Sequence, residues 1–181
     1  WLDPSNSSVT SIDGYDPNTP SVALDIGIQS VESPSGVICG DSFTPEVVVR
    51  NYGSDPINSF EILYNLDGAA NQSFSWTGTL ASAATINLVL PEISGVGAGN
   101  HVFNASTSNP NNQSDQNLPN DAASSGFDLF TNSVILELNF LTDNYAEENT
   151  WELIDDQSNV IYNGGPYAQD QTLYTEQLCV G

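Results

Sequence analysis

The chain has 181 residues, 39% of them hydrophobic, which is enough apolar surface to build a packed core. It carries 23 Asp and Glu but one basic side chain, Arg50, and its net charge is −22. With one Arg and one His it has almost nothing to neutralise phosphates, so nucleic acid and anionic lipid are excluded as partners. An apolar run of about eighteen residues is also missing, and we expect any export signal to have been removed upstream of Trp1.

The negative charge comes from missing bases rather than from extra acids. At ordinary usage a chain of this length carries about twenty Lys and Arg, and a similar number of acids. A salt-adapted surface adds carboxylates, whereas a surface exposed to a peptidase that cuts after Lys or Arg needs only to lose its cleavage sites. The composition therefore favours a secreted or cell-surface chain that lives beside such a peptidase.

The chain begins with a turn-rich connector, residues 1–21, which is dense in Asp, Asn, Pro and Ser. Apolar residues then alternate with period two, which predicts strands at 22–31 and 46–53. In the first strand Leu24, Ile26 and Ile28 share one face, and in the second strand Val47 and Val49 do the same.

Five further strands are predicted at sandwich-like spacing, and Gly, Pro, Asn and Asp separate them. They cover residues 59–66, 72–78, 85–91, 100–107 and 124–130. Seven short strands without helical periodicity predict an all-β, seven-stranded, Ig-like antiparallel sandwich over residues 22–131. The expected core is apolar and aromatic: Phe60, Ile62, Tyr64, Phe74, Trp76, Ile86, Leu88, Leu90 and one of the adjacent pair Val102 and Phe103.

A second, smaller β-sheet module is predicted over residues 132–181. Its four strand candidates lie at 133–143, 150–156, 159–165 and 172–179. Four strands leave one face of the sheet open, and a small sheet alone rarely buries enough surface to be stable. Either the module docks on the sandwich, or it is incomplete and its missing strands lie beyond Gly181. In both cases we expect it to be the weaker unit.

The two cysteines, Cys39 and Cys179, are too few to define a disulfide framework. They pair with each other, pair with cysteines outside this chain, or remain buried thiols. Composition alone does not choose among these alternatives.

The sequence offers few residues that could form a catalytic site. His101 is the single histidine and lies in an alternating strand pattern, where it lacks a nucleophile motif and the further ligands of a zinc site. Paired carboxylates such as Asp155 and Asp156 sit on one turn rather than across a cleft, which favours solvated turn residues. Trp76 and Trp151 fit a core better than a sugar-binding platform. Arg50 is expected in an ion pair or, alternatively, as an ordinary residue at the end of a strand. The chain alone is therefore predicted not to be an enzyme.

A structural calcium is the one cofactor that the loops favour, because they offer carboxylate and amide oxygens. None of these loops follows the EF-hand spacing. The first predicted ligand set is Asp115, Asn117 and Asp121, and the second is Asp143 with Glu147.

Three stretches resemble known families. "SPSGVICGDSFTPEVVVRNYGSDPINSFEILYNLDG", "SFSWTGTL" and "GFDLF" resemble the Ig-like, CARDB-type accessory modules of secreted bacterial proteins, often type IX secretion substrates. The stretch from "LELNFLTDNYAEENTWELID" to "YTEQLCV" resembles another module of such proteins. The opening "WLDPSNSSVTSIDGYDP" resembles the end of the catalytic domain of lysyl endopeptidase-like serine peptidases, which implies that the catalytic His, Asp and Ser lie upstream of Trp1.

The resemblances and the composition together predict a non-catalytic accessory region of a secreted or cell-surface protein. It would space, stabilise or tether an upstream peptidase domain, its main partner. The first alternative is an adhesin module that binds a cell-surface protein or polysaccharide. The second alternative is a small hydrolase that uses acidic residues.

Overall fold

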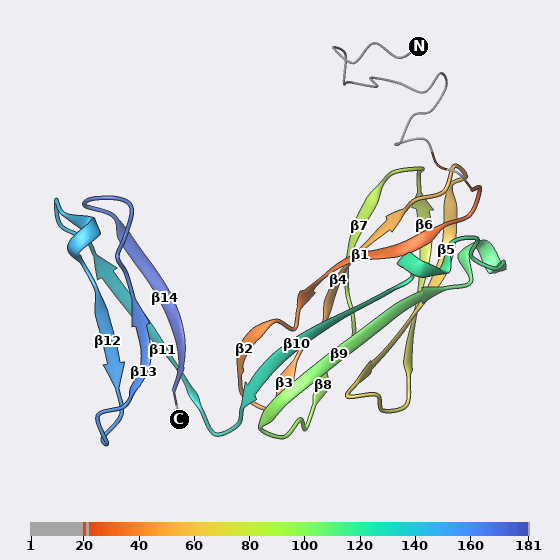
Figure 1. Cartoon of the computed structure of the whole chain (residues 1–181). Helices are drawn as coiled ribbons and strands as arrows, with labels where there is room; N and C mark the ends of the chain where they lie inside the picture. The colour runs from red at the N-terminus through yellow and green to blue at the C-terminus, as the bar shows by residue number, and fades with distance from the viewer. Residues whose placement is uncertain (1–19, 21, 181) are drawn as a thin grey trace, which may run out of the picture. The chain divides into compact units, whose positions relative to one another are not determined.

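The computed structural model describes residue 20 and residues 22–180, so the predicted connector at 1–21 lies almost wholly outside the described residues (Figure 1). The chain divides into two compact units. The first contains Phe43–Ile93, His101–Phe127 and the chain up to Ser35; the second contains Gly36–Ser42, Ser94–Asn100 and Asp128–Gly181. No helix among the described residues is long and apolar enough to cross a membrane.

One sheet of the sandwich has three antiparallel strands in the order β1-β4-β7. They are β1 (Ile26–Ser33), β4 (Glu46–Asn51) and β7 (Thr85–Val89). In the central strand Val49 lies opposite Ile28 on one side and Ile86 on the other. Val47 and Val49 are both fully buried, because the period-two alternation of β4 turns them to the same face.

The other sheet has five strands in the order β2-β10-β9-β5-β6. They are β2 (Gly36–Cys39), β10 (Ala122–Phe130), β9 (Gly99–Ser108), β5 (Ile57–Leu66) and β6 (Gln72–Leu80). The turn between β5 and β6 places Asp67 at φ 53° and Gly68 at φ 72°. Two successive positive φ angles define the turn type whose twist matches an antiparallel hairpin, and Asp-Gly is a favoured pair for it.

The core between the two sheets largely matches the sequence prediction. Phe60, Ile62, Tyr64, Leu88, Leu90 and Phe103 are buried, while Val102 turns outward. Phe74, Trp76 and Ile86 are half-buried, and Trp76 stacks on Phe60 at 4.9 Å between ring centroids. The protein is therefore an all-β molecule with an Ig-like sandwich.

All seven predicted strands form, and three short ones join them. These are β2 and the pair β3 (Ser42–Phe43) and β8 (Ile93–Ser94). The connection between β9 and β10 contains two 3-10 turns, η1 (Pro110–Asn112) and η2 (Leu118–Asn120). Strands of two to four residues are too short to show alternation in the sequence.

The second unit contains two further strand pairs. β11 (Val134–Leu141) pairs with β14 (Leu173–Val180), and β12 (Trp151–Ile154) pairs with β13 (Val160–Gly164), with the 3-10 turn η3 (Ala146–Glu148) between β11 and β12. From Val134 to Val180 the described buried residues are Thr142, Ala146 and Leu178. Such a core is thin, because even a small domain usually buries roughly 60% of the surface that its unfolded chain exposes.

Aromatic side chains supply much of the packing in this unit. The ring of Tyr167 lies 5.3 Å from that of Phe140 and 4.3 Å from that of Tyr174. Trp151 is half-buried, and its Nε1 donates a hydrogen bond to the Tyr167 hydroxyl at 2.6 Å. Trp151 thus belongs to a half-buried aromatic cluster.

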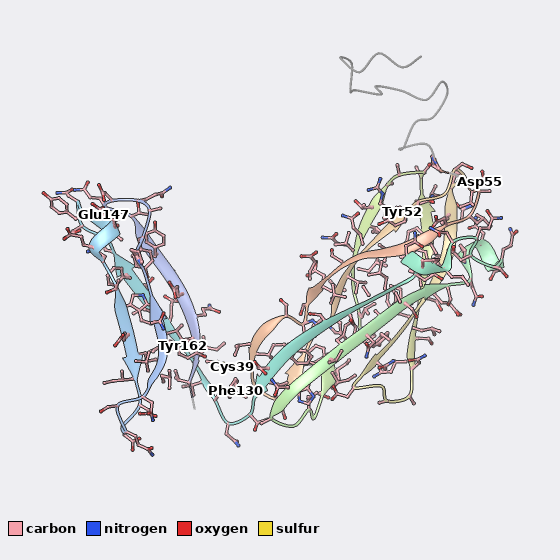
Figure 2. The ribbon with its side chains drawn as sticks, in the orientation of Figure 1. Cys39, Tyr52, Asp55, Phe130, Glu147 and Tyr162 are labelled. Atoms are coloured by element: carbon pink, nitrogen blue, oxygen red, sulfur yellow. A yellow bond between two sulfur atoms is a disulfide. The ribbon has the colours of Figure 1, made fainter. Side chains whose placement is uncertain are left out.

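Cys39 and Cys179 form a disulfide within the second unit, with their Cα atoms 5.6 Å apart. The first of the three sequence alternatives is thereby selected. Beside the bridge, the Tyr162 hydroxyl donates to the Cys179 carbonyl at 2.8 Å; Cys39 and Tyr162 are labelled in Figure 2.

Candidate functional site

Three carboxylates, Asp25, Asp115 and Asp121, gather where β1 begins. The β9–β10 connection runs back beside the start of β1, because Asp115 Oδ2 accepts the Ile26 N–H at 2.8 Å. The Gln116 side chain adds to this contact by accepting the backbone N–H groups of Ala23 and Leu24. A loop far along the chain is therefore fastened to the start of β1.

Asp25 is the most buried member, at 4% exposure. Its Oδ1 accepts the side-chain amide of Asn120 at 2.7 Å, and its Oδ2 accepts that of Asn117 at 3.0 Å. Sequence reasoning missed Asp25, because alternation places it opposite Leu24 and Ile26 and so on a solvent face. A polar residue inside an apolar strand was the signal that could have found it.

At Asp121, burial and two neighbouring negative charges act together on the carboxyl group. Its backbone carbonyl accepts the Thr107 N–H at 2.9 Å, which fixes the residue against β9. Its buried Oδ1, like that of Asn120, has no hydrogen-bond partner among the described residues. Burial, followed by the negative charges of Asp115 and Asp25, raises the pKa of Asp121 to about 7. Near neutral pH this carboxyl is therefore close to half-protonated.

The structure brings together the first predicted ligand set, Asp115, Asn117 and Asp121. Even so, no three His, Cys, Asp or Glu side chains of the described residues are arranged to hold a metal ion. The reason is that Asp115 and Asp25 direct their oxygens at N–H donors, including the Asn117 N–H at 2.8 Å from Asp115 Oδ1. A cation would need the amides of Asn117 and Asn120 to turn their oxygens inward. The arrangement as it stands is a carboxylate–amide network.

The second predicted pair lies in the second unit. Asp143 Oδ1 accepts the Tyr145 N–H at 2.9 Å, a hydrogen bond across a tight turn that Asp commonly makes. Glu147 is exposed on η3 and is labelled in Figure 2. Here Asp143 acts as a turn residue.

His101 lies on β9, in the strand that the sequence predicted. Its Nδ1 is 2.7 Å from Asp67 Oδ2, and Asp67 Oδ1 accepts the Val102 N–H at 2.8 Å. The hydrogen bond from His101, followed by that from Val102, lowers the pKa of Asp67. The imidazole, 14% exposed, also packs 5.5 Å from the Phe127 ring. These contacts fasten the β5–β6 turn to β9.

The expected ion pair of Arg50 is wrong. Its guanidinium lies 5.1 Å over the Tyr52 ring, and within the described part of the chain no carboxylate comes within ion-pair distance of it. Arg50 alternates with the buried Val49 and Asn51 along β4, so its side chain lies on the outer face of the sheet, where it packs on the Tyr52 ring.

Comparison with known proteins gives no matching family model and no matching curated protein. Among solved structures, the CARDB domain of the PF1109 protein from Pyrococcus furiosus is similar in its solution structure, at 19% identity and TM-score 0.48, covering 60% of this chain and 96% of that one. Its crystal structure, described as a complex with di-metal ions, has 19% identity and TM-score 0.46 and covers 64% and 98%.

A third similar structure is alpha-2-macroglobulin from Escherichia coli, from domain MG7 to the C-terminus. It has 13% identity and TM-score 0.39, and the match covers 73% of this chain and 20% of that one. At TM-scores below 0.5, none of these likenesses carries an argument about what this chain does.

Proposed function

We propose that this chain is a non-catalytic accessory region of a secreted, lysyl endopeptidase-like serine peptidase or a similar type IX secretion substrate, and that it spaces, stabilises or tethers the upstream catalytic domain. The observation that carries the proposal is that the chain contains no lysine and a single arginine, Arg50. Arg50 lies in β4, whose backbone is paired on both sides by β1 and β7. A peptidase must draw an extended segment into its cleft, so a paired central strand is a poor substrate.

The disulfide supports a location outside the cytoplasm, because disulfides persist in oxidising compartments. The bridge closes a separation of 140 residues. On the chain-entropy account, closing a loop of that size stabilises the folded state by about 4 to 5 kcal/mol. A disulfide-bonded accessory region without lysine suits a protein that works beside its own peptidase.

The test begins with the protein isolated from its native source. Its intact mass and terminal sequences should place a trypsin-like catalytic domain before Trp1. A variant of that protein lacking residues 20–181 should keep its kcat/KM on a small lysyl substrate and lose activity faster on prolonged incubation. An upstream domain of another class, or an unchanged lifetime, would contradict the proposal.

Calcium binding at Asp115, Asn117 and Asp121 stays a proposal, with Asp25 added to the set. It is supported by the unpartnered Oδ1 atoms of Asp121 and Asn120 beside three carboxylates. For Asp143 and Glu147 the support is weaker, because Asp143 is already used within its turn. Thermal unfolding with Ca²⁺ and with a chelator tests for a structural calcium, and Asp121→Asn tests whether the first set holds it: the midpoint should rise with Ca²⁺ in the native chain but not in Asp121→Asn. Equal midpoints in the native chain would exclude a structural calcium.

A further inference from the structure

The outer face of the five-stranded sheet carries a groove of about 330 Å³. It lies across β5, β9 and β10, within the first unit. Leu63 and Asn65 on β5, and Asn104 and Ser106 on β9, point outward because their neighbours Tyr64, Phe103 and Ala105 face the core. Asn71, Ser124 and three alanines complete the lining.

Every lining residue is uncharged, in a chain whose net charge is −22. Glu61, two residues along β5 from Leu63, has its Oε2 engaged by the Asn109 side-chain amide at 3.0 Å. An anionic ligand would be repelled by the acidic surroundings, and a cation would find no carboxylate within the lining. The groove therefore selects for a neutral ligand.

Three amides of the groove are oriented before any ligand arrives. Asn65 Oδ1 accepts both the Gly68 N–H at 3.0 Å and the Asn104 amide at 3.1 Å, while Asn65 Nδ2 donates to Asn71 Oδ1 at 2.7 Å. In this chain of hydrogen bonds Asn71 uses its acceptor and Asn104 uses its donor. The Nδ2 donor of Asn71 and the Oδ1 acceptor of Asn104 are thus the groups available to a ligand.

A donor and an acceptor held side by side complement adjacent hydroxyls, since each hydroxyl both donates and accepts. The hydroxyls of Ser106 and Ser124 extend this polar lining, while Leu63 and the exposed Ala122 offer small apolar contacts for C–H groups. A purely apolar ligand would leave the amides without partners, which is costly. We propose that this groove binds a neutral oligosaccharide, a unit of an extracellular polysaccharide. The proposal is independent of the spacer role, because the isolated chain holds the whole groove.

The test is a titration of the isotope-labelled chain with a panel of neutral hexaoses built from glucose, xylose, mannose and N-acetylglucosamine. Binding is monitored by NMR, through the chemical shifts of the amide groups. The lining contains no aromatic ring, so we expect weak binding, with a Kd in the roughly millimolar range. At least one hexaose should move the amides of Asn65, Asn71 and Asn104 together. An oligomer of galacturonic acid serves as the charged comparison and should bind at least about tenfold more weakly.

Two variants probe the groove in different ways. Asn71→Ala with Asn104→Ala removes the donor and acceptor, and Ser124→Trp fills the space on exposed β10; each should weaken binding at least about tenfold. Asn87→Ala, an exposed amide on β7 of the other sheet, is the matched control and should bind as the native chain does. Loss of binding in the double variant and in Ser124→Trp, with unchanged thermal midpoints, supports the site. Absence of shifts with every neutral hexaose at about 10 mM, or native affinity in Ser124→Trp, overturns it.

Discussion

At the scale of single residues, Asp121 should make the stability of the sandwich depend on pH. Its folded-state pKa of about 7 lies above the ordinary value of 3.8, so the folded chain holds a proton that the unfolded chain releases between these two values. Stability therefore falls as pH rises through this window. Because the residue is only half-buried, solvent screening reduces the effect to about 1 kcal/mol.

The measurement is urea unfolding at several pH values from roughly 5 to 8, for the native chain and for Asp121→Asn. Asn cannot ionise, so the variant should show a flatter profile and should be more stable than the native chain at the alkaline end. Asp156→Asn, an exposed acid in the second unit, is the control and should keep the native slope. Parallel profiles for the native chain and Asp121→Asn would show that Asp121 does not hold the proton.

Asp67 is the second residue whose role can be measured. It accepts hydrogen bonds from His101 and Val102 while adopting φ 53°, which Asn tolerates better than Ala. Asp67→Ala should cost about 1 to 3 kcal/mol, from lost hydrogen bonds and backbone strain together. Asp67→Asn should cost less, because it keeps an acceptor for Val102.

The pH dependence of this contact has the opposite sign. The folded pKa of Asp67 is lowered, so its contribution is complete above the ordinary value of 3.8 and is lost as pH falls through the folded value. The stability of the native chain should therefore approach that of both variants in acid, while Asp67→Ala keeps the part of its cost that comes from backbone strain. Equal stability of Asp67→Ala and the native chain at neutral pH would show that the turn is not held by this side chain.

At the scale of elements, the strands were predictable and the contacts between distant segments were not. β4, and β5 from Phe60 onward, alternate so regularly that their buried residues follow from spacing alone. β2, β3 and β8 are too short to show a period. The pairing of β11 with β14, rather than with its neighbour in sequence, depends on the register Ile135 opposite Cys179, which no local pattern encodes.

The candidate site, too, was predictable only in part from the sequence. Asp115, Asn117 and Asp121 lie within one loop, so their composition drew attention to them. Asp25 joins them from 90 residues earlier in sequence, as the Asn117 and Asn120 hydrogen bonds with separations of 92 and 95 show. Sequence pattern predicts which residues can ligate or titrate, but the docking of the loop on β1 decides which of them meet.

The second unit should be less stable than the first. From Val134 to Val180 few residues are buried, so its amides should exchange faster than those of β4, β5 and β9. Hydrogen exchange followed by mass spectrometry measures this directly. Reduction, or Cys39→Ser with Cys179→Ser, should speed exchange in residues 134–180 and leave β4 and β5 nearly unchanged. Equal protection of both units before and after reduction would contradict the expectation.

At the scale of the whole molecule, the missing bases and the disulfide act together on proteolysis. Arg50 and the chain's lack of lysine leave one bond for trypsin and none for a lysine-specific peptidase. Heat-denatured chain should therefore survive the lysine-specific enzyme intact. Trypsin should cut it once, after Arg50, and native chain should resist because that bond lies in the central strand β4.

The bridge makes a further outcome measurable. Residue 50 lies between Cys39 and Cys179, so the two tryptic pieces should remain joined without reductant and separate only after reduction. Gln157→Lys, in the exposed turn between β12 and β13, supplies a matched control: a lysine-specific peptidase should now cut the folded chain at that turn, again yielding joined pieces. We expect the cleavage rate at residue 157 to exceed that at Arg50 by at least about tenfold, because the turn opens at lower free energy than the central strand. Rapid cutting of the native chain after Arg50 would show that the strand does not protect this bond, and pieces that separate without reductant would show that the bridge does not hold them together.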